Sequence, residues 1–372
     1  MKIEDLALQR NKYKHLSDDE WRWFLQQVEG KERTADKLPS FAAIEDWWYP
    51  VRLSCEQCSS ELAARYKASL VSGEKMVDLT GGYGVDTYFL SEQFGHTDYV
   101  EQNAELCGIA EHNFSIQKSA ISIQNCTAED FIASAGQYDL IYLDPARRDS
   151  HGGKVFRLED CTPNVVELLP TLLLHGKRIL LKLSPMLDLT QAIKELSAVS
   201  LQWSVYVVAI KNEVKEVLLL SGGTGQITAI DLDKKDQAFV FTKEVEGKAN
   251  FLSQGNDYFK YQISNFKFIY EPNAAILKAG AYKLIAERFG LSKLDVNTHL
   301  YASEELVPNF PGRVWKIVEK QDLKQANVLC RNYPLTPDQL KKKLHLRDGG
   351  TAFVIGCRVN GKPTLFFAER IA

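Results

Sequence analysis

Charged side chains follow directly on an apolar run at residues 138–149, which read YDLIYLDPARRD. The segment from Leu140 to Leu143 is typical of a strand buried on both faces, as strands of a parallel sheet are. Asp144 and Pro145 come immediately after it, at the carboxyl end where ligands bind in such sheets. A carboxylate in that place can accept hydrogen bonds from a substrate. A turn begun by the Asp-Pro pair is the alternative interpretation.

Two arginines, Arg147 and Arg148, complete this stretch. A guanidinium group suits a phosphate or a carboxylate because it presents a planar fork of donors. On that interpretation the arginines hold the substrate, and a backbone phosphate would suit RNA. The alternative is structural, with an arginine paired to Asp149 or Asp160 so that it holds the loop in place.

A glycine-rich loop lies earlier in the chain, in the sequence MVDLTGGYGVD at residues 76–86. It follows an apolar strand and opens a helix, and its glycines let the backbone approach a ligand closely. Asp78 ends the strand, where it can reach a cofactor, and Glu101 ends the next strand 23 residues later. A carboxylate there can accept hydrogen bonds from both ribose hydroxyls, although an exposed strand-end acid is the alternative. The full G-x-G-x-x-G pattern is missing, which disfavours a dehydrogenase.

The elements that must position these residues alternate between strands and helices from residue 76 onward, after a helical pattern over residues 1–72. Two later apolar runs, WSVYVVAI and VKEVLLL, are separated only by Lys211, Asn212 and Glu213. A connection this short cannot make a parallel crossover, so the two runs must form an antiparallel hairpin. A parallel sheet that finishes in such an edge hairpin is not the arrangement of the dinucleotide dehydrogenases.

Beyond residue 223 the pattern predicts two small α+β modules. In the second module, Thr336 is expected to cap a helix, with Pro337 at its first position and Gln339 three residues after the cap. Two apolar runs then flank Asn360-Gly361, which is a strong signal for a tight hairpin turn.

Together, the stretch from Asp78 to Gly84, Glu101 and the DPARRD stretch resemble the motifs of class I S-adenosylmethionine-dependent methyltransferases, over roughly residues 76–222. The C-terminal part is similar to that of bacterial methyltransferases with a THUMP-like domain, in its element order and in the stretches FPGRVWKIVE and RNYPLTPDQL. The resemblance implies an α/β fold: a Rossmann-like class I methyltransferase sheet with an antiparallel final hairpin, a helical N-terminal segment, and ferredoxin-like and THUMP-like α+β modules at the C-terminus. We expect four segments, at residues 1–72, 73–223, 224–325 and 326–372.

The same resemblance implies an enzyme that uses S-adenosyl-L-methionine as its cofactor. The residues that would bind it are Asp78, Thr80, Gly81, Gly82, Gly84, Asp86, Glu101, Gln102, Ala128 and Glu129. Thr127 stands where many members have the acid that binds the adenine amine, so Glu129 or Asp130 would substitute for it. The run EQCSSELAARYK looks like the helix that precedes the glycine loop and helps to close the cofactor site.

The residues expected to act on the substrate are Asp144, Pro145, Arg147 and Arg148. Amino-methylating relatives carry an acid-Pro-Pro-aromatic stretch at this place, and Ala146-Arg147 replaces its second half here. The 5-methyluridine enzymes need a cysteine near the fifth strand, where this chain has Lys182-Leu183-Ser184-Pro185. Covalent methylation at pyrimidine C5 is therefore disfavoured, and direct methyl transfer is expected.

Composition and charge narrow the class of protein. The 372 residues carry a net charge of −3, with no long apolar run for a membrane helix and no secretory signal at the N-terminus. Cys55 and Cys58 form a lone CxxC among seven scattered cysteines, so we expect no metal site and a cytoplasmic protein with reduced thiols.

Residues 327–372 carry eight Lys or Arg against three Asp or Glu, a net charge of +5. A basic module on a mildly acidic body suits contact with nucleic acid, and a solvated helix face is the alternative. We therefore expect a methyltransferase that acts on RNA, with the C-terminal modules holding the substrate. Methylation of a small molecule or a protein is one alternative, and a non-catalytic protein that binds S-adenosylmethionine or RNA is another.

Overall fold

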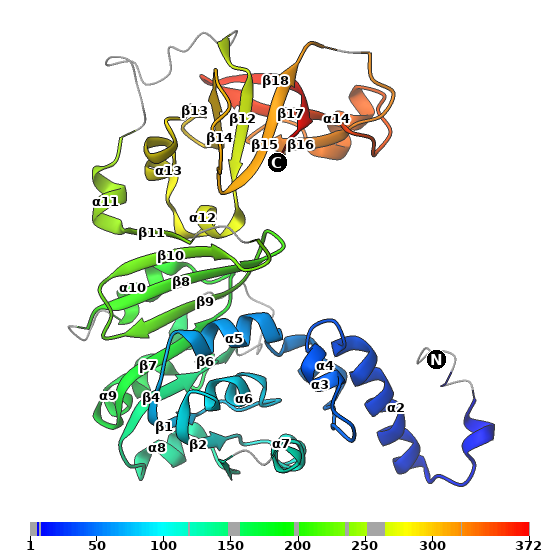
Figure 1. Cartoon of the computed structure of the whole chain (residues 1–372), viewed down its shortest axis with the longest axis vertical. Coiled ribbons are helices and arrows are strands. Elements are labelled where there is room, and N and C mark those ends of the chain that lie inside the picture. The colour runs from blue at the N-terminus through cyan, green and yellow to red at the C-terminus, as the bar shows by residue number, and fades with distance from the viewer. Residues whose placement is uncertain are drawn as a thin grey trace. The chain divides into compact units, whose positions relative to one another are not determined.

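The structure is a computed structural model that describes residue 6 and residues 9–117, 120–147, 157–196, 201–234, 238–250, 265–320 and 322–371. The chain separates into two compact units. The first comprises Met1–Ser204 and Val217–Thr224, and the second comprises Val205–Glu216 and Gly225–Ala372. Figure 1 labels the elements along the chain.

The first unit begins with helices. They are η1 (Arg10–Tyr13), α2 (Asp18–Thr34), α3 (Pro39–Ala42), α4 (Arg52–Gln57) and α5 (Glu61–Ser69). The run EQCSSELAARYK, expected to form one helix, is divided between α4 and α5. The division arises because the side chain of Ser60 accepts a hydrogen bond from the Ala63 N–H, and this cap starts a new helix.

A sheet with helical connections follows in the same unit. Its elements are β1 (Gly73–Asp78), α6 (Val85–Ser91), β2 (Phe94–Val100), α7 (Ala104–Ile116), β3 (Ile121–Gln124), α8 (Ala128–Ala133), β4 (Tyr138–Leu143), β5 (Ala146–Arg147), η2 (Leu158–Asp160), β6 (Cys161–Thr162), α9 (Val165–His175), β7 (Gly176–Leu183) and α10 (Leu189–Leu196). β1 pairs in parallel with β2 and β4, β2 pairs with β3, and β4 pairs with β7. Because these strands are parallel, the carboxyl ends of β1, β2, β4 and β7 lie along one edge of the sheet.

The expected hairpin is present as β8 (Trp203–Ile210) and β9 (Glu213–Ser221). Its two turn residues, Lys211 (φ 54°) and Asn212 (φ 60°), have the pair of positive φ angles of a tight hairpin turn. β9 pairs antiparallel with β7, which gives the order β9-β7-β4-β1-β2-β3. The hairpin is not an edge, however, because β8 pairs in parallel with β10 (Gln226–Asp231), and β10 pairs with β11 (Phe239–Thr242).

The second unit continues with α11 (Lys243–Lys248), β12 (Phe268–Pro272), α12 (Ala274–Ala279), α13 (Tyr282–Phe289), β13 (Ser292–Asp295), β14 (Thr298–Ser303), β15 (Gly312–Val318), β16 (Asn327–Arg331), α14 (Pro337–Lys343), β17 (Ala352–Val359) and β18 (Lys362–Arg370). Seven strands form one sheet in the order β13-β14-β12-β15-β18-β17-β16. The pairing of β15 with β18 joins strands that the sequence pattern assigned to two modules.

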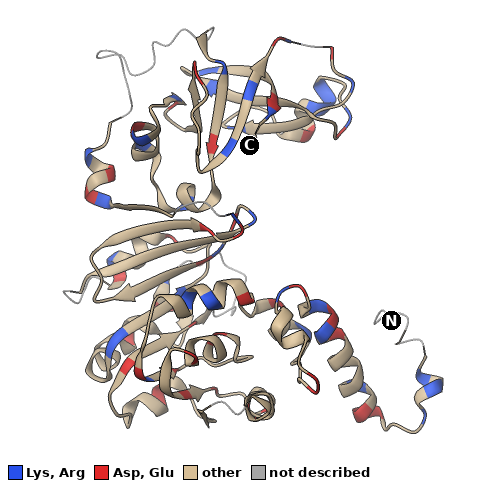
Figure 2. Cartoon of the chain, in the orientation of Figure 1, with Lys and Arg blue, Asp and Glu red and all other residues tan. Residues whose placement is uncertain are grey.

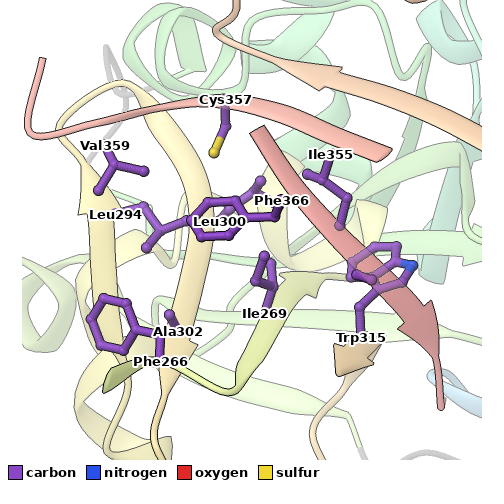
Figure 3. Packing of buried hydrophobic residues seen from close by; sticks show 11 residues of the cluster. Phe266, Ile269, Leu294, Leu300, Ala302, Trp315, Ile355, Cys357, Val359 and Phe366 are labelled. Carbon is purple, nitrogen blue, oxygen red and sulfur yellow. The ribbon is translucent and has the colours of Figure 1, made fainter. Parts of the chain in front are cut away.

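One hydrophobic core draws on strands from both halves of this sheet. Figure 3 shows Ile269, Leu300 and Trp315 from the earlier strands packed with Ile355 and Phe366 from the later ones. All five side chains are buried. The core therefore draws on both of the expected C-terminal modules.

Local signals at the C-terminal end of the chain are confirmed. The side chain of Thr336 accepts from the Gln339 N–H, and Gln339 bonds back to the Thr336 N–H. Asn360 (φ 50°) and Gly361 (φ 76°) form the turn between β17 and β18. The expected α/β fold class with its helical N-terminus is thus confirmed. Within the described residues, none of the helices is long and apolar enough to cross a bilayer.

Candidate active site

The glycine loop between β1 and α6 depends on its glycines. Gly82 (φ 54°) and Gly84 (φ 83°) have the left-handed backbone that favours glycine. A Cβ atom on Gly81 would lie 2.1 Å from the ring of Tyr99 on β2. The Tyr99 hydroxyl donates to the Gly82 carbonyl oxygen at 2.6 Å. The loop is therefore held in one shape against β2.

Asp78, at the end of β1, is a buried carboxylic acid whose hydrogen bonds come from neutral groups. Its Oδ1 accepts from the Thr80 N–H at 2.9 Å, and its Oδ2 accepts from the Thr87 hydroxyl at 2.6 Å. Burial raises the pKa of Asp78 to about 7, and the charges of Asp86 and Asp144 add to that effect against the hydrogen bonds. Asp78 thus exchanges a proton near neutral pH.

Glu101 lies just after β2 and holds the loop from the other side. Its Oε2 accepts from the Gly82 N–H at 3.0 Å, and its Oε1 accepts from the Asn103 N–H at 2.8 Å. A carboxylate has about four acceptor positions, so these two bonds leave capacity for a ligand.

Asp86, in the first turn of α6, is the centre of a buried polar network. Its Oδ2 accepts from the Ser59 hydroxyl at 2.8 Å and from the Tyr142 hydroxyl at 2.7 Å. The Lys67 ammonium lies 3.2 Å from its Oδ1, and the Lys182 ammonium lies 3.7 Å from its Oδ2. Burial opposes ionisation of Asp86, but the two lysines outweigh it and lower its pKa below the usual range.

Asp144 begins the segment after β4 and is tied to two parts of the unit. Its backbone N–H donates to the Thr80 hydroxyl oxygen at 2.7 Å. Its Oδ2 accepts from Lys182 on β7 at 2.5 Å. The side chain of Asp144 is 38% exposed, whereas that of Lys182 is 11% exposed. The acid therefore reaches open space while its cation is set into the wall.

These residues line a common cavity of about 330 Å³ in the first unit. All ten residues predicted to bind a cofactor line it: Asp78, Thr80, Gly81, Gly82, Gly84, Asp86, Glu101, Gln102, Ala128 and Glu129. The cavity volume is in the range usual for small-ligand sites. The break between α4 and α5 adds Cys58 and Ser59 to its wall.

Of the four residues predicted to act on the substrate, Asp144 is the one among the described residues that lines the cavity. Asp144 lines the cavity together with Ala146, which pairs with Thr162 in the short β5–β6 sheet. Pro145 lies between them but is not among the described lining residues. The backbone of Arg147 is the second residue of β5, and Arg148 lies outside the described residues, as does Asp149.

The two acids expected to bind adenine, Glu129 and Asp130, lie in different surroundings. Glu129 lines the cavity with an exposed side chain. Asp130 is instead bonded to Thr127, whose hydroxyl lies 2.8 Å from the Asp130 carboxylate and caps α8. Among the described residues, no cluster of His, Cys, Asp and Glu is arranged to hold a metal ion.

The polar residues of the cavity wall that sequence reasoning did not assign to the site include Ser59, Tyr142 and Lys182. Lys182 did carry a signal, because a lysine interrupts the apolar run of KRILLKLS and so has to be buried with partners. Ser59 lies in the run EQCSSELAARYK, which was expected to help close the cofactor site, but its contact with Asp86 had no signal. The same holds for Tyr142, since these bonds to Asp86 join residues 27 and 56 positions apart.

Comparisons with known proteins give family matches in the C-terminal part of the chain and a structural match over nearly all of it. A family model of a ferredoxin-like domain matches residues 268–311, and a model described as THUMP domain-like matches residues 299–370. A crystal structure described as "putative methyltransferase" from Porphyromonas gingivalis W83 is 33% identical, with a TM-score of 0.83 over 96% of this chain and 92% of that one.

Curated relatives agree with that match. A protein named "Uncharacterized S-adenosylmethionine-dependent methyltransferase" from Mycobacterium tuberculosis, strains CDC 1551 / Oshkosh and H37Rv, is 21% identical over 358 residues. The match covers 91% of this chain and 92% of the relative. This chain is therefore a methyltransferase with S-adenosyl-L-methionine as its cofactor.

The cavity fits that cofactor. S-Adenosylmethionine carries ribose hydroxyls, which need acceptors, and positive charge, which favours ionised acids nearby. Glu101 has acceptor capacity beyond its bonds to Gly82 and Asn103. The ionised form of Asp78 would gain from a positive ligand, because its hydrogen bonds come from Thr80 and Thr87 rather than from a cation. The chain belongs to the family of S-adenosylmethionine-dependent methyltransferases with ferredoxin-like and THUMP-like domains in their C-terminal part.

Proposed function

We propose that this enzyme methylates RNA by direct transfer to an acceptor held beside Asp144. The observation that carries the proposal is the place of Asp144, on the wall of the cavity that the glycine loop also lines and bonded to Thr80 of that loop. Bound S-adenosylmethionine supplies an electrophilic methyl group. The contribution of the chain is to position the acceptor and to exclude water.

Each predicted site residue has a role in this proposal. Glu101 would accept from the ribose hydroxyls, Asp78 would accept from the α-ammonium group of the amino-acid end, and Glu129 would take the adenine amine. The other predicted cofactor residues, Thr80, Gly81, Gly82, Gly84, Asp86, Gln102 and Ala128, shape the cavity around the cofactor. Asp144 and Pro145 hold the acceptor, while Arg147 and Arg148 bind a phosphate of the RNA backbone.

The RNA part of the proposal is supported by the second unit. Its THUMP-like match suggests contact with RNA, and Figure 2 shows basic positions along α14. Lys341 is paired with Asp338 and Asp348. Lys342, Lys343 and Arg347 have exposed side chains that phosphates can reach.

We also propose that the chain is organised in four segments, at residues 1–72, 73–223, 224–325 and 326–372. We further propose that it acts in the cytoplasm. All seven cysteines are free thiols, which fits a reducing compartment. Fractionation of cells followed by immunodetection tests the location.

The proposed function is tested by incubating the enzyme with radiolabelled S-adenosylmethionine and total RNA from a strain that lacks this protein. We expect label in the RNA, and the Glu101→Ala variant should lose cofactor affinity by calorimetry. Glu105→Ala is the matched control, because Glu105 is exposed and does not line the cavity. Label in protein or in small molecules, with none in RNA, would overturn the proposal.

RNA binding is tested separately by filter binding at several salt concentrations. Replacing Lys342, Lys343 and Arg347 together by Gln should weaken binding and flatten its salt dependence, because fewer counterions are released. Three exposed lysines of the first unit, Lys12, Lys14 and Lys31, serve as the control triple variant. Equal losses in both variants would argue against a role for α14.

A further inference from the structure

Lys182 is a cation set into a strand that is otherwise apolar. Its neighbours Leu180, Leu181 and Leu183 on β7 are buried, and Lys182 itself is 9% exposed. Burying an ammonium group is unfavourable unless it is paired. Lys182 meets that condition through Asp144 at 2.5 Å and Asp86 at 3.7 Å.

The Lys182–Asp144 pair lies on the wall of the methyl-transfer cavity, and its two members offer opposite hydrogen-bonding chemistry. An ammonium group only donates, and a carboxylate only accepts. An alcohol group matches such a pair, because its oxygen accepts one hydrogen bond while its O–H donates another. The exocyclic amine of a base does not match, because both of its N–H bonds need acceptors.

The aromatic side chains of the cavity also favour an alcohol over a base as the acceptor. A nucleobase that is drawn into an active site is held by stacking on aromatic rings. Among the described residues that line the cavity, the two aromatic rings belong to Tyr83 and Tyr142. They are 5% and 1% exposed, and their hydroxyl groups are bonded to Trp48 and Asp86. Both rings are therefore almost fully buried in the wall, which leaves little ring surface on which a base could stack.

We propose that the methyl acceptor is an alcohol oxygen, the ribose 2′-hydroxyl of RNA, held between Lys182 and Asp144. This inference rests on the proposed function as an RNA methyltransferase. The 2′-hydroxyl is the alcohol that every internal RNA nucleotide carries. Lys182 donates to one lone pair of the oxygen, so that the other lone pair is left to attack the methyl carbon.

The acceptor oxygen forms a bond to the methyl carbon while the bond from that carbon to sulfur breaks, and the electron pair of the broken bond stays on sulfur. The positive sulfonium thereby becomes a neutral thioether. The hydroxyl proton passes from the oxygen to the Asp144 carboxylate and from there to water.

The position of the methyl group in the product tests this inference without any variant. RNA labelled by the enzyme is hydrolysed in alkali, which cleaves next to free 2′-hydroxyls and spares 2′-O-methylated links. We expect the label in alkali-resistant dinucleotides and, after enzymatic digestion, in ribose-methylated nucleosides. Label in base-methylated nucleosides would overturn this inference and leave RNA methylation intact. Absence of label from RNA would overturn the proposed function itself.

Variants then test Lys182. The Lys182→Met variant should lose about 100-fold or more in kcat, as expected when the group that holds the reacting oxygen beside its proton acceptor, Asp144, is removed. Its dissociation constant for S-adenosylmethionine, measured by calorimetry, should stay within about threefold, because Asp86 keeps Lys67. Lys182→Arg should recover part of kcat, since it restores a donor to Asp144.

The matched control is Lys177→Met on the same strand, where an exposed lysine pairs with Asp139. It should leave kcat unchanged. If Lys182→Met binds the cofactor normally and keeps its kcat, Lys182 has no part in the reaction. If it loses cofactor binding, Lys182→Arg decides between the two roles. Recovered binding with only part of kcat supports the role in the reaction, and full recovery of kcat together with binding makes Lys182 a structural residue.

Discussion

Asp86 in the first unit and Glu271 in the second are both buried carboxylates that carry two cations, and the cations differ in their access to water. Asp86 is paired with Lys67 and Lys182, whose side chains are 0% and 11% exposed. Glu271 on β12 is paired with Arg313 and Arg331, each at 2.5 Å, whose side chains are 28% and 39% exposed. The cations of the first network are almost fully buried, and those of the second are partly hydrated.

The two networks also join different things. Glu271 lies directly opposite Arg313 in the pairing of β12 with β15, and Arg331 ends β16. It thereby connects the stretches FPGRVWKIVE and RNYPLTPDQL, which are far apart in the sequence, and its role is architectural. The Asp86 network instead reaches the cavity wall through Lys182 and Asp144. The same arrangement of charges thus joins strands of a sheet in one unit and builds the wall of the cavity in the other.

The largest expected difference between the networks is in stability. Asp86→Asn removes the negative charge that the two buried lysines share. We expect it to lower the free energy of unfolding by about 3–5 kcal/mol. Urea denaturation followed by circular dichroism measures this. Glu213→Gln, in an exposed pair with Lys215, is the control and should change it by less than about 0.5 kcal/mol. A loss near the control value would show that the network is not buried as described.

The hydrogen bonds within the Asp86 network should contribute less each. Tyr142→Phe removes one donor to the Asp86 carboxylate and should cost about 2 kcal/mol in the free energy of unfolding, as for a bond to a charged group. Tyr88→Phe is the matched control, because the Tyr88 hydroxyl makes only a 3.4 Å bond to exposed Gln117. Equal effects of the two substitutions in the same urea titration would contradict the assignment.

A third buried carboxylate, Asp78, sharpens the comparison because no lysine or arginine bonds to it among the hydrogen bonds and ion pairs of the described residues. Its pKa is raised to about 7, mainly by burial, whereas the pKa of Asp86 is lowered. A cationic cofactor favours ionised Asp78, so its binding should weaken as pH falls through 7. Between pH 8 and pH 6 the affinity for S-adenosylmethionine should fall about tenfold.

Calorimetry at several pH values measures this dependence. The Asp78→Asn variant has no proton to exchange at this position and should bind S-adenosylmethionine with a flatter pH profile. An unchanged slope in the variant would assign the proton to another group.

The smallest effect is expected in the second unit. Glu271→Gln should lower the free energy of unfolding by about 1 kcal/mol, since Arg313 and Arg331 can turn to water when their partner loses its charge. Affinity for S-adenosylmethionine should stay as in the unaltered enzyme, because Glu271 does not line the cavity. A loss as large as that of Asp86→Asn would remove the distinction between the two networks.

Local signals made much of this molecule predictable. The glycine loop, Glu101 at a strand end and the turn at Lys211-Asn212 are each specified by a few neighbouring residues, and the structure places them as expected. The division of one expected helix at Ser60 was also local, but a serine inside a helical pattern is a weak signal.

Long-range contacts were out of reach. The pairing of β15 with β18 depends on tertiary packing, and no single stretch of sequence specifies it. The Asp86 network has the same character, because Ser59, Tyr142 and Lys182 come from separate elements that only the folded sheet brings together. The residues that the sequence missed are therefore those whose meaning lies in their partners.

The hydrogen bond from the Asp144 N–H to the Thr80 hydroxyl has one more consequence. Thr80 belongs to the glycine loop and Asp144 follows β4, and 64 positions of sequence separate them. The Thr80 N–H also donates to Asp78, so this one threonine connects the glycine loop with the end of β1 and the end of β4. In the proposed function, this threonine therefore holds the acceptor residue at a set distance from the glycine loop before any ligand binds, so the distance does not have to be established again in each turnover.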